Sequence, residues 1–271
     1  MTTTPTPTTG RSPQVGLFVT CLVDMFRPSI GFATVKLLEM AGCRVEVPDT
    51  QTCCGQPTYN SGDRRSTAEI ARGVIDSFDG YEYVVGPSGS CIGMLHDYPQ
   101  LFEKTDPYHD RAVDLAKRAF EITSFLTDVI GADLSLESYA KKVTYHDSCA
   151  GLRELGIKKQ PRHLLGKVDG VEIEEMEEAE TCCGFGGTFC IKYPDISNRM
   201  VGNKTKNAAA TKADVLLGGD LGCLLNMAGK LKREGEKLEV RHVVEVLAGM
   251  TDTPAIGQSV EEFNYELAQE A

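Results

Sequence analysis

The sequence lacks several features that mark whole classes of protein. Its 271 residues include no tryptophan, and no apolar run approaches the roughly 20 residues that a membrane-spanning helix needs. Basic residues are outnumbered by acidic ones, since the chain has 28 Lys and Arg and 39 Asp and Glu, which give a net charge of −11. Contacts with nucleic-acid phosphates need clustered Lys and Arg, so this balance argues against a nucleic-acid partner. No Gly-x-Gly-x-x-Gly segment follows a predicted strand, which removes the usual sign of a dinucleotide-binding fold.

Ten cysteines stand out against this composition. Residues 1–13 are rich in Thr and Pro and have no apolar core of a secretory signal, so we predict a disordered tail there. A protein without such a signal is expected in the cytoplasm, where thiols stay reduced. The cysteines are therefore better interpreted as metal ligands or redox groups than as disulfides. The Cys-x-x-Cys spacing of zinc knuckles and dithiol redox motifs is absent.

Eight of the cysteines form two ordered sets with the same pattern of one Cys, a Cys-Cys-Gly and one further Cys. The first set consists of Cys21, Cys53, Cys54 and Cys91, and the second set consists of Cys149, Cys182, Cys183 and Cys223. Corresponding members lie 128 to 132 residues apart. Such a repeated order indicates an internal duplication.

Short apolar or alternating segments predict three strands in each half, at residues 15–20, 44–47 and 83–85 and at residues 142–146, 171–173 and 214–217. Periodic apolar residues predict intervening helices, among them residues 67–78, 196–212 and 224–232.

This alternation predicts an α/β fold of two duplicated βαβ-type domains with parallel sheets, related by a pseudo-two-fold axis. We place the first domain at residues 14–136 and the second at residues 137–250, followed by an acidic C-terminal tail at residues 251–271.

Each cysteine group follows a predicted strand. Because the carboxyl ends of parallel strands meet at one edge of a sheet, each set is expected to gather at that edge. Four cysteine thiolates are the common ligands of an iron–sulfur cluster. Structural zinc also suits four thiolates, so both metals remain open at this point. Gly55 and Gly184 permit the irregular backbone that two adjacent cysteines need to reach one site.

Several other residues have two interpretations. Cys43 lies at the start of a strand and is predicted in the core, whereas Cys190 is either an extra ligand of the second set or a buried thiol. His146 is either a proton carrier beside the metal or part of a polar pair that caps the strand end, and we favour the cap. Lys204 and Lys206 are predicted to face solvent.

The combined motifs resemble the cysteine-rich CCG domain found in one of the subunits of heterodisulfide reductase and, within that group, the lactate utilisation protein A family. The resemblance extends from about Val15 to Gly249 and is carried by Val19-Thr-Cys21-Leu-Val-Asp24, Thr52-Cys-Cys-Gly-Gln-Pro57, Gly86-Pro-Ser-Gly-Ser-Cys91, Cys182-Cys-Gly-Phe-Gly-Gly187 and Gly222-Cys-Leu-Leu-Asn226. It implies one or two clusters of the [4Fe–4S] type, held by the eight cysteines of the two sets. It further implies electron transfer during oxidation of L-lactate to pyruvate, together with two other subunits, an iron–sulfur protein and a small third component.

One departure from the pattern bears on the type of cluster. Heterodisulfide reductase ends each repeat with Cys-x-x-Cys, whereas this chain has Cys91-Ile-Gly-Met94 and Cys223-Leu-Leu-Asn226. The fifth cysteine of each repeat is missing, which leaves the cluster type and a heterodisulfide substrate open. No flavin site is visible, so the chain is not expected to oxidise lactate alone. The alternatives are a subunit of a disulfide or heterodisulfide reductase and a structural zinc-binding scaffold.

Overall fold

A computed structural model describes residues 12–264 of the chain, which form two compact units. The first unit takes the described residues up to Ser135 together with Ala150–Leu164, and the second takes Leu136–Cys149 and the described residues from Leu165 onward. The predictions for residues 1–11 and 265–271 concern parts of the tails outside the described residues. Among the described residues, every helix is too short or too polar to cross a lipid bilayer.

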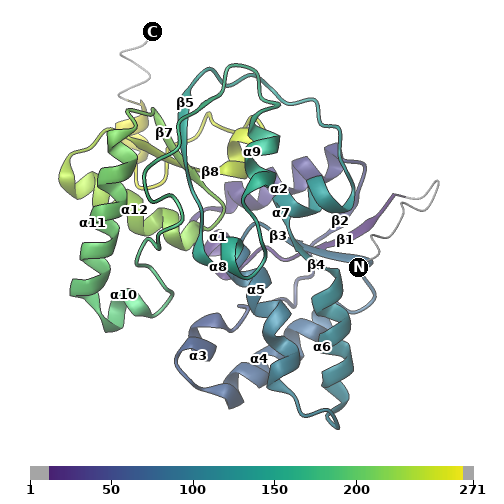
Figure 1. Ribbon diagram of the computed structural model, residues 1–271. Coiled ribbons are helices and arrows are strands. Elements are labelled where there is room, and N and C mark those ends of the chain that lie inside the picture. Colours follow the sequence, from purple (N-terminus) through teal and green to yellow (C-terminus); the bar gives the residue numbers. More distant parts are fainter. Residues whose placement is uncertain (1–11, 265–271) are drawn as a thin grey trace. The chain divides into compact units, whose positions relative to one another are not determined.

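The first unit is built on a four-stranded, all-parallel sheet (Figure 1). Its order is β2-β1-β3-β4, in which β1 pairs with both β2 and β3. The strands span Gln14–Leu17 (β1), Arg44–Glu46 (β2), Tyr83–Gly86 (β3) and Ala119–Glu121 (β4).

The second unit repeats this sheet in the order β6-β5-β7-β8, again with all strands parallel. Its strands span Lys142–His146 (β5), Glu172–Ile173 (β6), Val215–Gly218 (β7) and Glu239–His242 (β8). The predicted α/β class with duplicated parallel sheets is therefore confirmed. The prediction of three strands in each half is wrong, because β4 and β8 each add a fourth. Both are too short and too polar to show a strand pattern alone, and they form because β3 and β7 offer a free edge to pair with.

Helices connect the strands of the first unit. They span Cys21–Phe26 (α1), Pro28–Met40 (α2), Gln56–Asn60 (α3), Arg64–Ser77 (α4), Gly89–Asp97 (α5), Tyr98–Leu101 (η1), Pro107–Arg118 (α6), Ile122–Ser124 (α7) and Phe125–Val129 (η2). The Asp63 side chain accepts from the N–H of Ser66 at 3.0 Å, and Asp106 accepts from the N–H of Tyr108 at 2.8 Å. These aspartates fix where α4 and α6 begin, because each satisfies an N–H that has no partner inside its helix. The two helices lie side by side (Figure 1).

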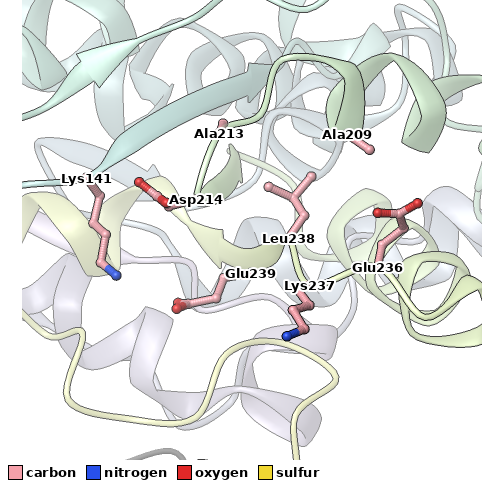
Figure 2. Close-up of a pocket in the computed structure, with 8 residues that line it drawn as sticks. All are labelled: Lys141, Ala209, Ala213, Asp214, Glu236, Lys237, Leu238 and Glu239. Atoms are coloured by element: carbon pink, nitrogen blue, oxygen red, sulfur yellow. The ribbon is translucent and has the colours of Figure 1, made fainter. Parts of the chain in front are cut away.

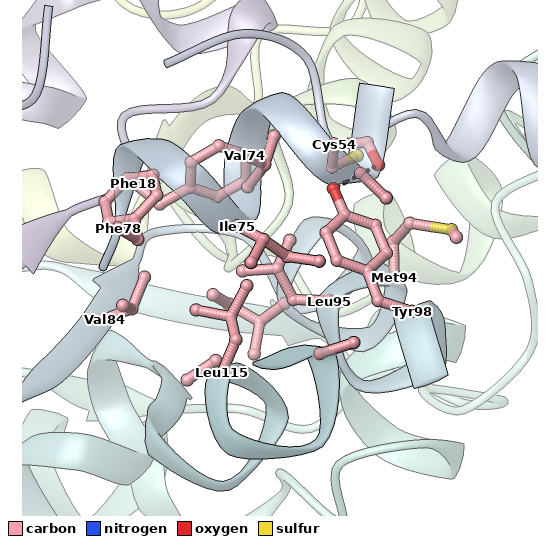
Figure 3. Close-up of a cluster of buried hydrophobic side chains, with 14 of the residues drawn as sticks. Phe18, Cys54, Val74, Ile75, Phe78, Val84, Met94, Leu95, Tyr98 and Leu115 are labelled. Carbon is pink, nitrogen blue, oxygen red and sulfur yellow. Dashed lines mark hydrogen bonds between the residues drawn. The ribbon is translucent and has the colours of Figure 1, made fainter. Parts of the chain in front are cut away.

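The core of the first unit reaches the first cysteine set (Figure 3). Phe18 packs edge-on against Phe78 with ring centroids 5.5 Å apart. At the other end of this core, the hydroxyl of buried Tyr98 donates to the carbonyl of Cys54 at 2.9 Å. Packing of this core therefore fixes the backbone of the Cys-Cys pair.

The remaining helices come after β5 in the chain. They span Cys149–Arg153 (α8), Lys159–Leu165 (α9), Phe189–Lys192 (α10), Pro194–Ala210 (α11), Leu221–Glu234 (α12) and Val243–Leu247 (α13). The long helices α11 and α12 lie side by side (Figure 1). Beyond α13, Ala255 and Ile256 are buried, and the N–H of Ile256 donates to the carbonyl of Val240 at 2.8 Å, so this part of the chain packs onto β8.

Candidate metal centres

The first cysteine set collects side chains from three connections of its sheet. Cys21 begins α1 after β1, the pair Cys53 and Cys54 lies in the loop between β2 and α3, and Cys91 lies in the first turn of α5 after β3. Ser88 caps α5 and accepts from the N–H of Cys91 at 3.3 Å. The fold thus brings the set to the carboxyl edge of the sheet, where the positive ends of two helix dipoles favour negative charge.

The thiols of the first set form one connected group. Hydrogen bonds from Cys21 and Cys54 to the Cys53 sulfur lower the pKa of Cys53. The same bond, with burial, raises the pKa of Cys21, and bonds to Cys53 and Cys91 raise that of Cys54. The backbone N–H of Gly55 also points at the Cys53 sulfur, 3.4 Å away. These hydrogen bonds therefore favour the thiolate of Cys53 over those of Cys21 and Cys54, and a cation among the sulfurs would favour further ionisation.

The second set repeats this arrangement. Cys149 begins α8 after β5, Cys182 and Cys183 follow β6, and Cys223 lies in the first turn of α12 after β7. Hydrogen bonds from Cys149 and Cys183 lower the pKa of Cys182, and bonds to Cys182 raise the pKa of both donors. The N–H of Gly184 lies 3.3 Å from the Cys182 sulfur, as Gly55 does in the first set.

The glycine after the second pair is required by geometry. Gly184 has φ of +82°, and a Cβ at this position would lie 2.8 Å from the carbonyl oxygen of Ser197 in α11. A side chain would therefore be strained in its backbone and would also collide with the helix. The residue whose N–H lies beside the Cys182 sulfur must therefore be glycine.

His146 is the residue whose predicted role the structure changes most. The sequence favours a capping role for it, but neither ring nitrogen has a hydrogen-bond partner among the described residues, and the side chain is 1% exposed. Burial and the charge of Lys204 lower its pKa to about 3, so the imidazole is neutral. One of its nitrogens and the sulfurs of Cys183 and Cys223 lie within 4.8 Å of one another.

Lys204 does not face solvent, and that prediction is wrong. Its side chain is buried in α11, and its ammonium donates to the carbonyls of Glu178 and Ala179, each at 2.7 Å. Burial lowers its pKa to about 8, although Asp147 and the cysteines of the second set oppose this shift. The ammonium therefore holds the loop that leads to Cys182 and adds a positive charge near the sulfurs. The helical spacing of α11 predicted one buried face, but the residues around the ammonium come from a distant loop that the sequence alone did not place.

The two cysteines outside the sets differ in their surroundings. Cys43 is buried, as predicted, and burial raises its pKa to about 11. Cys190 is half-buried at the start of α10, and its thiol donates to the carbonyl of Gly187 at 3.4 Å.

The donor chemistry of both sets fits an iron–sulfur cluster. Each set offers four sulfurs from three connections and a backbone N–H directed at one of them, which are the features that hold such clusters and tune their potential. A hollow of about 340 Å³ lies elsewhere (Figure 2). Its lining includes Lys141, Asp214 and Glu239, which stand at the amino ends of β5, β7 and β8, so this hollow is at the sheet edge opposite the cysteines.

The sequence matches the CCG Cysteine-rich domain twice, over residues 15–96 and 143–228. It is 46% identical over 234 residues to "Lactate utilization protein A" of Oceanobacillus iheyensis, covering 86% of this chain and 96% of that protein. The protein of the same name from Halalkalibacterium halodurans gives the same identity and coverage. "Lactate utilization protein A 2" of Bacillus cereus strain AH820 is 43% identical over 236 residues, which cover 87% of this chain and 98% of that protein.

A solved structure shares the fold. The crystal structure of a hypothetical protein from Helicobacter pylori aligns with a TM-score of 0.57 at 12% identity. The match covers 95% of this chain but only 52% of that protein, so this chain spans about half of its length. At this identity the likeness concerns the fold alone.

Proposed function

Because this chain belongs to the lactate utilization protein A family and carries the CCG cysteine-rich domain twice, we propose that it is the iron–sulfur electron-transfer subunit of a multi-component system that oxidises L-lactate to pyruvate. The observation that carries the proposal is the gathering of four sulfurs in each unit. The names of the relatives support a role in lactate utilisation, and the cysteine sets support the binding of iron–sulfur clusters.

The residues that would hold the clusters are the two cysteine sets, Cys21, Cys53, Cys54 and Cys91 in one unit and Cys149, Cys182, Cys183 and Cys223 in the other. A bound cluster of the [4Fe–4S] type takes up and releases one electron at a time. The N–H groups of Gly55 and Gly184 stabilise negative charge on the sulfurs beside them, and Lys204 adds a buried positive charge to the second set.

The number of electrons released by lactate implies that partner proteins take part in the reaction. Oxidation of lactate to pyruvate releases two electrons and two protons, whereas each cysteine set would carry single electrons. We therefore propose that another subunit takes the electron pair from lactate and passes it to this chain in two steps. The proposal includes two partners, an iron–sulfur protein and a small third component, in the cytoplasm.

Anaerobic purification followed by counting of iron and acid-labile sulfide per chain tests the proposal. We expect Cys53→Ser and Cys182→Ser each to remove the metal of one unit, and Cys43→Ala, which alters a buried cysteine outside the sets, to leave the iron count unchanged. Lactate-dependent reduction of the clusters by the assembled partners should be lost with the iron. Stoichiometric zinc in place of iron would instead establish a structural zinc scaffold.

A further inference from the structure

The duplication allows each position of the second cysteine set to be compared with its equivalent in the first. Phe18 and His146 each lie three residues before the first cysteine of their set. The residue before each of them pairs with the same position of the neighbouring strand, since Leu17 pairs with Val85 in β3 and Tyr145 pairs with Leu217 in β7. The two side chains therefore occupy the same place in the two sheets.

The two places are filled in chemically different ways. Phe18 belongs to the apolar core of the first unit, where its ring packs against Phe78 (Figure 3). His146 is as deeply buried, but it brings two nitrogen atoms to a position that an apolar ring fills in the first unit. Neither nitrogen has a hydrogen-bond partner among residues 12–264. Burial of a polar group without a partner costs free energy, so the structure leaves a place for a partner that the described residues do not supply.

Cys183 and Cys223 show what kind of partner fits. Their sulfurs and a ring nitrogen of His146 lie within 4.8 Å of one another. Two atoms that bind the same metal at about 2.0 to 2.3 Å can lie up to roughly 4.6 Å apart, so small movements suffice for a common metal. All three residues are buried, and a capping role for His146 is excluded because a cap requires a hydrogen bond to the backbone.

We propose that His146 is a nitrogen ligand of the metal group at the second set, beside Cys183 and Cys223, and that the two sets therefore hold their groups with different ligands. The first set binds through sulfur, since Phe18 stands where the histidine is. This inference rests on the proposed function for the identity of the metal as iron. Nitrogen ligation in place of a thiolate raises the potential of an iron–sulfur centre, so exchange of one cysteine ligand of the second set for His146 would raise the potential of that centre relative to the first.

Pulsed electron paramagnetic resonance of protein labelled with ¹⁵N-histidine tests the ligand directly. The Cys53→Ser background confines the signal of the dithionite-reduced protein to the second set. We expect a ¹⁵N coupling of the size that a direct iron–nitrogen bond gives. Iron at the second set without such a coupling overturns the inference and leaves the proposed function standing, whereas a chain that holds no iron at all overturns both.

Variants at residue 146 give a second measurement. His146→Phe makes this position like that of the first unit and should abolish the ¹⁵N coupling and change the potential of the second centre. His146→Cys supplies a sulfur ligand, and it should keep the iron while losing the coupling. His163→Gln changes an exposed histidine and should leave both the coupling and the potential as they are. A coupling that persists in His146→Cys would overturn the assignment to His146.

Discussion

The ammonium of Lys204 is a buried positive charge close to the second cysteine set. α11 and α4 bury equivalent positions, with Ser197 corresponding to Thr67 and Val201 to Ala71, and in this register Lys204 corresponds to Val74. A cation thus accompanies the second set where the first has an apolar side chain. Because positive charge favours the reduced form of a nearby centre, the two centres are expected to differ in potential.

We predict that Lys204→Met lowers the reduction potential of the second centre. The change also removes the hydrogen bonds from the ammonium to the carbonyls of Glu178 and Ala179, and loss of a hydrogen bond from a charged donor costs about 1.5 to 3 kcal/mol of unfolding free energy. Redox titration followed by electron paramagnetic resonance measures the first effect, and urea unfolding measures the second. Lys206→Met, two residues away on the exposed face, is the matched control, and an equal shift in both variants would contradict the prediction.

At the scale of elements, the loop before α10 depends on its glycines in two distinct ways. Gly184 and Gly187 both have positive φ, of +82° and +62°. A Cβ on Gly187 meets nothing within 4 Å, whereas one on Gly184 meets the backbone of α11. A side chain at residue 187 would therefore add only backbone strain, whereas one at residue 184 would add both backbone strain and a steric collision.

We predict that Gly187→Ala destabilises the protein by about 1 to 2 kcal/mol, the usual cost of a left-handed conformation with a side chain. Gly184→Ala is expected to cost more and to reduce the iron bound at the second set, because α11 or the Cys182–Cys183 loop must shift. Thermal unfolding and iron analysis of the two variants measure these effects. Equal losses in both variants would show that contact with α11 is unimportant.

The N-terminus of α6 gives a pH-dependent prediction. The N–H of Tyr108, followed by Arg72 at 2.9 Å, lowers the pKa of Asp106 below its ordinary value of 3.8. A carboxyl with a depressed pKa in the folded state stabilises the fold above its unfolded pKa, and this stabilisation is lost as the pH falls through the folded pKa.

We therefore expect Asp106→Asn to be less stable than the unaltered chain at pH 7 and to match it at pH values well below 4, where the aspartate is protonated. Urea midpoints of the metal-free proteins across this range provide the measurement. A difference between the two proteins that stays constant with pH would show that the charge of Asp106 contributes nothing.

At the scale of the whole molecule, the proposed metal is expected to stabilise both units. Each set crowds four sulfurs at the carboxyl edge of a small sheet, and hydrogen bonds from neighbouring thiols lower the pKa of Cys53 in one set and of Cys182 in the other. A metal that binds four thiolates replaces the lost protons and joins three separate connections of the chain. Its binding free energy is therefore available only to the folded state.

We predict that removal of the metal by an iron chelator under reducing conditions lowers the unfolding temperature of the protein. Circular dichroism of the metal-bound and metal-free proteins measures the shift, and Cys43→Ala should show the same shift as the unaltered chain. An unchanged unfolding temperature would contradict a structural contribution of the metal in either unit.

The sequence by itself determined the duplication, the two cysteine sets and the parallel α/β sheets, because those features depend on order and local periodicity along the chain. Strands followed directly by cysteines are enough to predict that each set gathers at one sheet edge.

The tertiary structure decided what long-range packing controls. β4 and β8 exist because a neighbouring strand pairs with them, and residues 150–164 join the first unit although they follow Cys149 in the chain. Lys204 and His146 carry no local sign of their burial, since the groups around them come from residues 25 to 77 positions away. Ordinary polar side chains thus acquire their chemistry here from the fold that encloses them.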